Sequence, residues 1–277
     1  MRLRGVKSSR NVDDRRRAGG GRRAGGVGLF GVLIILAIGY FAGIDVTPLL
    51  NQTAAPAQSQ ATTAEQDQAA DFSTRVLATT EEVWDDIFAN QLGRDYTPPV
   101  LVLFSGLTQS PCGGASGATG PFYCPVDQKA YLDTDFFVTL NRQMGAGGDF
   151  AAAYVIAHEV AHHVQNQLGI LAPVDQRRRQ VSKVEANALT VRLELQADCL
   201  AGVWANNVGE LLEPGDIEEA LNAAVRIGDD HLQRQAGRVP APHTFTHGTS
   251  KQRAGWFARG YQSGNLSQCD TFSAANL

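Results

Sequence analysis

The chain has 277 residues, of which 43% are hydrophobic and 19% charged, so it can bury one sizeable core and still carry appendages. Its net charge of -4 conceals an uneven distribution. Residues 1–23 contain nine basic and two acidic residues, a balance of +7, which leaves 15 basic and 26 acidic residues, a balance of -11, for the rest. The basic leader contains no aromatic residues and precedes an apolar segment, so we expect no nucleic-acid partner.

The apolar segment covers residues 24–44. These 21 consecutive uncharged residues, at about 1.5 Å per residue, can cross about 30 Å of hydrocarbon. We predict an uncleaved transmembrane helix; a cleavable signal peptide is the alternative, although residues 39–43 contain no clear A-x-A site. The arginines at 15–17 and 22–23 should hold the leader, residues 1–23, in the cytoplasm. The expected protein is therefore a single-pass cell-membrane protein whose body is outside the cytoplasm, either periplasmic or extracellular.

A flexible linker is predicted between the membrane and the folded body. Residues 51–71 are rich in Gln, Ala, Thr and Ser and have too few large apolar side chains to fold, so we assign residues 45–71 to the linker. The folded domain is then expected over residues 72–277. Its first elements are a helix that ends before Gly93 and a strand over Pro99–Phe104.

Four cysteines in a body outside the cytoplasm favour two disulfides, for which three pairings are possible. Cys112 and Cys124 flank one glycine-dense loop, so we predict that they pair and leave Cys199 to pair with Cys269. A zinc site made of cysteines is disfavoured because the sequence has no C-x-x-C. Short strands are expected at Phe122–Cys124, Ala130–Leu132 and Phe136–Leu140.

The motif His-Glu-Val-Ala-His, residues 158–162, follows an Ala-rich apolar run that predicts a buried helix. Residues four apart share one face of a helix, so His158 and His162 can bind one zinc ion. Glu159 would then face a water molecule that the metal activates. Two hydrogen-bonded core histidines are the alternative. His163 points about 100° away from His162, and we expect it to donate to a backbone carbonyl.

A third ligand is expected from a second helix, predicted from Pro173 to Asn207. Glu194 and Asp198 are four residues apart there, in an apolar neighbourhood, which favours Glu194 as the third zinc ligand. Asp198 would accept the free N–H of a ligand histidine and thereby fix its tautomer. Two carboxylates on an exposed helix are the alternative, and that interpretation is preferred for Glu185.

The next helix is predicted from Asp216 to about Ala236, with Asp216 and Glu219 forming its cap. Asp229, Asp230 and His231 lie near its end. A second metal site there is disfavoured, because adjacent carboxylates on a helix point in different directions.

A loop at 243–250 leads into a last helix, which is expected to begin with a capping box at Thr249–Gln252. In this loop His247 could donate a hydrogen bond to the oxyanion that forms when a peptide carbonyl is attacked. The alternative for His247, and the preferred interpretation for His243, is a loop histidine satisfied by its neighbours.

Several segments together resemble one known family. They are H-E-V-A-H-H-V-Q at 158–165, E-L-Q-A-D-C-L-A-G at 194–202, T-H-G-T-S-K-Q-R-A-G-W-F at 246–257, C-G-G-A-S-G-A-T-G-P-F-Y-C-P at 112–125 and N-V-D-D-R-R-R at 11–17. The chain is similar to the bacterial neutral zinc metallopeptidases, membrane-anchored proteins of the zincin type, over nearly its whole length except the segment after the membrane span. Ala161 stands where the pattern has glycine, a change that slightly favours the helix.

The resemblance implies a Zn²⁺ cofactor, a peptide or protein substrate, and an edge strand that pairs with the substrate; by analogy we assign that strand to the Tyr123–Leu132 hairpin. The expected fold is α+β, a zincin-like (gluzincin-type) metallopeptidase domain, mainly helical with a small sheet, preceded by one transmembrane helix. His158, His162 and Glu194 would hold the metal.

In this interpretation Glu159 acts as the general base toward a zinc-activated water and then passes the proton to the leaving amine. Two alternatives stay open. One is a zinc-stabilised, catalytically idle binding module at the membrane, and the other is a zinc amidase or esterase that acts on a non-protein substrate.

Overall fold

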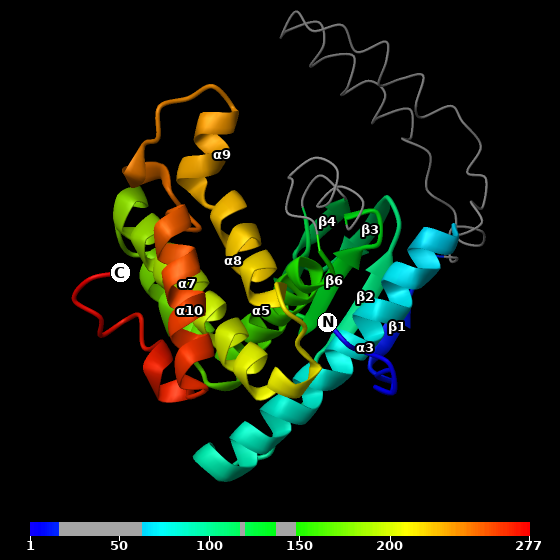
Figure 1. Cartoon of the computed structure of the whole chain (residues 1–277). Helices are drawn as coiled ribbons and strands as arrows, with labels where there is room; N and C mark the ends of the chain where they lie inside the picture. The colour runs from blue at the N-terminus through cyan, green and yellow to red at the C-terminus, as the bar shows by residue number, and fades with distance from the viewer. Residues whose placement is uncertain (17–62, 117–119, 137–147) are drawn as a thin grey trace, which may run out of the picture. The chain divides into compact units, whose positions relative to one another are not determined.

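The computed structural model describes residues 1–16, 63–116, 120–136 and 148–277 (Figure 1). The transmembrane helix predicted at 24–44 and most of the linker predicted at 45–71 lie outside these residues. Among the helices that the structure describes, none combines the length and the apolar character needed to span a membrane.

Residues Met1–Asp13 and Ala64–Leu277 form one compact unit, in which helices predominate. Its α-helices are α3 (Ala64–Ile87), α5 (Asp149–Gln167), α6 (Leu171–Arg178), α7 (Lys183–Asn207), α8 (Asp216–Arg226), α9 (Asp229–Gln235) and α10 (Ser250–Ser263). Its strands are β1 (Val12–Asp14), β2 (Val100–Phe104), β3 (Leu107–Ser110), β4 (Gly113–Ser116), β5 (Phe122–Cys124) and β6 (Lys129–Asp133). The prediction of a mainly helical α+β fold with a small sheet is confirmed.

The main sheet has the strand order β1-β2-β6-β5, and β3 and β4 form a separate antiparallel hairpin. Strands β2 and β6 are parallel, with Leu101 opposite Ala130, whereas β5 runs antiparallel to β6, with Tyr123 also opposite Ala130. The predicted strand at Pro99–Phe104 and the predicted Tyr123–Leu132 hairpin are confirmed. The strand predicted at Phe136–Leu140 lies outside the described residues except for Phe136, which is not in a strand.

Both faces of the main sheet are covered by apolar side chains. Alternate residues of β2, Leu101 and Leu103, point into the large core beneath the helices. Val102 and Phe104 point the other way and pack in a smaller cluster with Tyr131, whose ring stacks on Phe122 at 4.9 Å between centroids. Burial on both faces explains why the β2 sequence is continuously apolar instead of alternating.

Helix α5, which carries the His-Glu-Val-Ala-His motif, is buried along most of its length. It contacts strands β5 and β6 as well as helices α3, α7 and α8. Near its start the Phe150 ring stacks on Trp204 of α7, with 5.6 Å between centroids. The Ala-rich run before the motif allows this close packing on several sides, so the direction of the motif side chains is set by the core.

Both predicted disulfides are confirmed. Cys112, in the turn of the β3–β4 hairpin, is bonded to Cys124 at the end of β5. Cys199 of α7 is bonded to Cys269 in the turn that follows α10. The second bridge ties the carboxyl-terminal segment to the helix that carries Glu194.

The boundary predicted at Phe72 is too late, because α3 begins at Ala64. Residues 64–71 contain Ala, Glu and Gln, which are good helix formers, so they extend the helix even though they supply few core side chains. At its other end α3 continues as a π-helical turn, Phe88–Leu92, that stops at Gly93 in the left-handed conformation, with φ of 61°. The predicted stop before Gly93 is therefore confirmed.

Two of the predicted long helices are each divided in the structure. The helix predicted from Pro173 to Asn207 is α6 followed by α7, because Ser182 and Glu185 form a capping box that starts a new helix. The helix predicted from Asp216 to Ala236 is α8 followed by α9, with a break around Gly228.

The cap predicted for α8 is wrong. Gly215 occupies the cap position, and the Asp216 side chain accepts instead from the backbone N–H of Glu213 at 2.8 Å. Glu219 turns away to accept from the backbone N–H of Phe150 at 3.0 Å, at the start of α5. Glu219 therefore connects α8 to the first turn of α5, whereas the Asp216 contact is local. The capping box predicted at Thr249–Gln252 is confirmed.

Helices α7 and α10 approach each other closely through two glycines. A Cβ atom on Gly260 would lie 1.9 Å from the carbonyl oxygen of Cys199, and one on Gly202 would lie 2.1 Å from the carbonyl oxygen of Phe257. Because both obstacles are backbone atoms of helices, they cannot rotate away. This contact sets the position of α7, and hence of Glu194 and Asp198.

We predict that Gly260→Ala lowers the free energy of unfolding by about 3 kcal/mol, because the helices must separate to admit the methyl group. Gly255→Ala is the matched control on the same helix, since an added Cβ there meets nothing within 4 Å. It should raise the stability by about 0.5–1 kcal/mol through helix propensity. Urea unfolding followed by circular dichroism measures both values. Equal stability of the two variants would contradict this account of the contact.

Candidate metal centre

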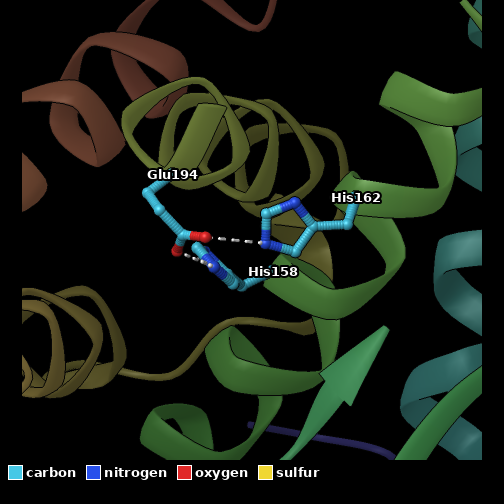
Figure 2. Close-up of side chains that lie close together, drawn as sticks. All are labelled: His158, His162 and Glu194. Carbon is cyan, nitrogen blue, oxygen red and sulfur yellow. Dashed lines mark hydrogen bonds and ion pairs between the residues drawn. The ribbon is translucent and has the colours of Figure 1, made fainter. Parts of the chain in front are cut away.

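Three predicted ligand residues come together on two adjacent helices. His158 and His162 project from α5 and Glu194 projects toward them from α7 (Figure 2). The Nε2 atom of His158 lies 3.2 Å from one oxygen of Glu194, and the Nε2 atom of His162 lies 3.5 Å from the other. Among the described residues this group of three could hold a metal ion, with its ligand atoms all within 4.8 Å of one another.

The donor set and its spacing fit zinc. Imidazole nitrogens and a carboxylate oxygen are ordinary zinc ligands, and two ligand atoms each about 2.0–2.1 Å from a tetrahedral zinc lie about 3.3 Å apart. The two nitrogen-to-oxygen distances, 3.2 and 3.5 Å, are close to that separation. Three protein ligands leave a fourth position of a tetrahedral site open, which is the pattern of catalytic zinc sites.

The tautomer of His158 is set by a buried ion network. Its Nδ1 atom lies 2.9 Å from Asp198, whose carboxylate can only accept, so Nδ1 carries the proton and donates it. Asp198 is fully buried and also accepts from the Tyr154 hydroxyl at 2.6 Å and from the Arg253 guanidinium at 2.8 and 2.9 Å. In the neutral His158 ring Nε2 therefore keeps its lone pair for a metal.

The tautomer of His162 is fixed by Gln165. Its side-chain oxygen lies 2.8 Å from Nδ1 of His162, and its amide nitrogen donates to the Leu193 carbonyl at 2.8 Å and to Gln196 at 3.0 Å. The two amide contacts fix which end of Gln165 faces His162, so the Nδ1 atom donates and Nε2 is left for the metal. Gln165 is fully buried, so no solvent competes for these contacts.

The charges of the cluster keep its carboxylates ionised. Burial alone would raise the pKa of Glu194, but when the two imidazoles are protonated, the charge of His162, together with the hydrogen bond and charge of His158, lowers the pKa well below its usual range. Burial likewise opposes ionisation of Asp198, and the charges of Arg253 and His158 overcome it and lower its pKa. An ionised Glu194 is the form that binds a cation.

The centre is accessible on one side. The side chains of His162 and Glu194 are 16% and 15% exposed, whereas that of Asp198 behind them is 0% exposed. Glu159 is partly exposed, and no described residue forms a hydrogen bond or ion pair with its carboxylate. The cluster is therefore supported on its buried side, while part of the His162 and Glu194 side chains reaches solvent.

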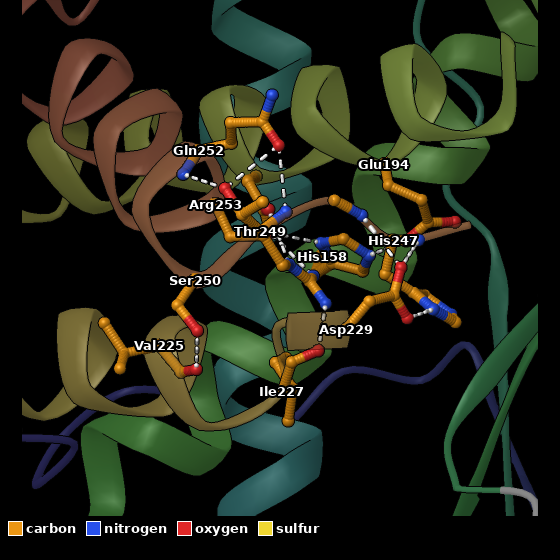
Figure 3. Close-up of polar contacts among 12 residues, drawn as sticks. His158, Glu194, Val225, Ile227, Asp229, His247, Thr249, Ser250, Gln252 and Arg253 are labelled. Carbon is orange, nitrogen blue, oxygen red and sulfur yellow. Dashed lines mark hydrogen bonds and ion pairs between the residues drawn. The ribbon is translucent and has the colours of Figure 1, made fainter. Parts of the chain in front are cut away.

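His247 lies beside the cluster, in the loop before α10 (Figure 3). Its Nδ1 atom is 3.2 Å from Asp229, and the same aspartate accepts from the backbone N–H groups of Thr246, His247 and Gly248 at 2.7, 2.6 and 3.1 Å. The hydrogen bond to Asp229 raises the pKa of His247, burial opposes this, and the charge of Glu194 raises it further. The His247 side chain is 50% exposed, so it can still meet a ligand.

The other polar residues considered in the sequence analysis either make structural contacts or are exposed. His163 bonds to the Thr97 carbonyl at 2.7 Å, as expected, and its Nδ1 atom lies 3.0 Å from the Tyr123 hydroxyl. Asp229 and Asp230 do not form a metal group with His231: Asp229 holds the His247 loop and Asp230 accepts from Ser250 at 2.7 Å. His243 is exposed, and Glu185 caps α7.

Four residues of the site were missed from the sequence: Tyr154, Gln165, Asp229 and Arg253. Tyr154 stands four residues before His158, so helical spacing could have indicated it. Gln165 stands three residues after His162 and could have been found in the same way. Asp229 and Arg253 reach the site only through tertiary packing, and no local pattern marks them.

Loss of the Gln165 side chain should weaken zinc binding. We predict that Gln165→Ala lowers the zinc affinity about 10–100-fold, because His162 loses the partner that orients its ring and fixes its tautomer. Gln167→Ala is the control, since Gln167 lies in the same helix but contacts His163 and Thr97 instead. Competition against a chromophoric zinc chelator measures both affinities. The account would be contradicted if the two variants bound zinc equally well.

Comparison with known proteins agrees with this geometry. The family described as "Putative neutral zinc metallopeptidase" matches residues 1–272. The uncharacterized protein YpfJ of Escherichia coli K12 is 46% identical over 288 residues, covering 98% of this chain and 99% of the relative. The uncharacterized protein Rv2575 of Mycobacterium tuberculosis is 48% identical over 216 residues, covering 73% and 71%. No solved structure matches the chain significantly. The chain therefore belongs to the neutral zinc metallopeptidase family that this description names.

Proposed function

We propose that this protein is a zinc-dependent peptidase of zincin-like, gluzincin-type architecture. The observation that carries the proposal is the convergence of His158, His162 and Glu194, each histidine with its Nδ1 proton already engaged. A closed structural site would need a fourth protein ligand, and among the described residues this group has three members. The partial exposure of the ligands supports catalysis over an idle, buried site.

Zinc bound here would acidify a water molecule and polarise the substrate carbonyl. Glu159, one residue after His158 and partly exposed, is assigned as the general base that accepts the proton of the attacking water. The water oxygen would bond to the carbonyl carbon, and the same carboxyl group would then give that proton to the amide nitrogen, so that the C–N bond breaks and releases an amine and a carboxylic acid. Asp198, Arg253 and Gln165 take no part in proton transfer and hold the ligand rings in place.

His247 is assigned as a donor to the carbonyl oxygen as negative charge develops on it. Because Asp229 can only accept, Nδ1 of His247 carries a proton, and Nε2 can donate only when the ring is an imidazolium. The raised pKa of His247 favours that charged form. Asp229 thus acts as a positioning residue that orients and charges His247.

Strand β5 is the proposed binding edge for an extended peptide. It is the last strand in the order β1-β2-β6-β5, and no described strand pairs with its other side. Tyr123 of β5 packs on α5, where its hydroxyl forms hydrogen bonds with His163 and Asn166 at 3.0 Å each. A peptide added antiparallel or parallel to this edge would be held by main-chain hydrogen bonds beside α5.

The two disulfides support an oxidising environment for the metal domain, as in the periplasm or outside the cell. Peptides or proteins in that compartment are the proposed substrates. The membrane anchor at 24–44 stays a prediction, since it lies outside the described residues.

Glu159→Gln should retain zinc and lose turnover. Removal of the general base is expected to lower kcat by at least about 10²–10⁴-fold, whereas the ligands and their partners are untouched. Glu218→Gln, on the exposed side of α8, is the matched control and should keep full activity. Cleavage of a peptide library with and without chelator, together with the zinc content of each variant, provides the measurement. Undiminished, chelator-sensitive cleavage by Glu159→Gln would rule out the assigned base.

His247→Gln should lower kcat about 10²–10³-fold with little change in zinc affinity. Since the charged ring is the donor and its pKa is raised, the rate of the unchanged protein should fall as the pH rises through that pKa. The variant should lack this alkaline decline. His243→Gln, in the same loop but with no side-chain hydrogen bond or ion pair to a described residue, is the control. An identical pH profile in the His247 variant would show that the residue is not the donor.

A further inference from the structure

The first 13 residues of the leader are folded onto the metal domain. Residues Met1–Asp13 belong to the same compact unit as Ala64–Leu277, and β1, which begins within this segment at Val12, forms the edge of the main sheet next to β2. The backbone N–H of Leu101 in β2 donates to the Asn11 carbonyl at 2.9 Å. Residues 1–13 are therefore part of the domain architecture.

Contacts hold residues 1–13 at intervals along this segment. The backbone N–H of Arg2 donates to the Leu211 carbonyl at 2.7 Å, and that of Ser9 donates to the Thr74 carbonyl at 3.0 Å. Glu81 of α3 accepts from the Ser9 hydroxyl at 2.5 Å and from the Asn11 amide at 2.9 Å. Side chains of Leu3 and Val12 pack against the large core.

The amino group of Met1 contacts the start of α5, the helix that carries His158 and His162. This ammonium group lies 2.9 Å from Asp149 of α5, 3.2 Å from Asp216 of α8 and 3.0 Å from Glu213. Burial alone would lower the pKa of this ammonium, but its hydrogen bonds to the three carboxylates raise it to about 10. Asp216 is only 4% exposed, so without this cation a buried carboxylate would lose its ionic partner.

These contacts conflict with the topology predicted from charge. If residues 24–44 crossed a membrane once, the leader and the body would lie on opposite sides of about 30 Å of hydrocarbon. None of the contacts from Met1 to Asn11 could then form, and the β2 edge would expose unpaired backbone groups. The match to the family, residues 1–272, also includes the leader.

We propose that residues 1–13 are an integral part of the metal domain and lie on the same side of the membrane as the metal centre. Residues 1–13 thus cover a surface of their own chain, which is formed by β2, α3 and the first turns of α5 and α8. A single crossing by residues 24–44, with the leader in the cytoplasm and the body outside, is incompatible with this arrangement.

Thiol labelling of the full chain in intact cells tests the location. The four native cysteines form two disulfides, so a new cysteine supplies the reactive thiol. Ser8→Cys reports on the leader and Val239→Cys, at a position 87% exposed, reports on the body. A membrane-impermeant maleimide should label both variants in intact cells, or both only after permeabilisation. Labelling of one variant in intact cells and of the other only after permeabilisation would overturn the proposal.

Hydrogen exchange on the purified full chain tests the docking itself. Glu81→Ala should speed deuterium uptake by residues 9–13 at least about tenfold, because it removes the carboxylate that accepts hydrogen bonds from the Ser9 and Asn11 side chains. Glu82→Ala, at the adjacent exposed position, is the control and should leave this uptake unchanged. Immediate full exchange of residues 9–13 in the unchanged protein would also overturn the proposal.

Discussion

The buried carboxylate of Asp198 is the interaction on which the arrangement of the centre depends. It joins His158 of α5, the Tyr154 hydroxyl of the same helix and the Arg253 guanidinium of α10. A buried carboxylate is costly unless it is paired and hydrogen-bonded, so the three helices must meet in one geometry for the fold to be stable. The same geometry holds Nε2 of His158 toward Glu194. The hydrogen bonds to Asp198 thus contribute both to the stability of the fold and to the geometry of the candidate metal centre.

The close contact of α7 and α10 supports this network from the other side. Gly202 and Gly260 let the two helices approach until backbone meets backbone, and the Cys199–Cys269 bridge ties the segment after α10 to α7. The guanidinium of Arg253, on α10, can therefore reach the carboxylate of Asp198, on α7. Rigid support of this kind keeps metal ligands in place when one face of the site is open to solvent.

Much of the centre could be predicted from the sequence, because its ligands follow local helical spacing. His158, His162, Glu194 and Asp198 are each identified by four-residue intervals, and the structure brings them together. Arg253 and Asp229 could not be predicted, since their roles arise where separate helices cross. The contacts of residues 1–13 with Leu211, Thr74 and Glu81 could not be predicted either, because they are long-range, whereas positive charge is a local feature of the sequence.

The central claim is that two imidazoles and one carboxylate bind the same zinc ion. X-ray absorption at the zinc edge of the fully loaded protein measures this most directly. We expect one zinc per chain with a first shell of nitrogen and oxygen at about 2.0–2.2 Å, including the scattering pattern of two imidazoles. A shell containing sulfur at about 2.3 Å, or a single imidazole, would contradict the assignment of His158, His162 and Glu194 as the ligands.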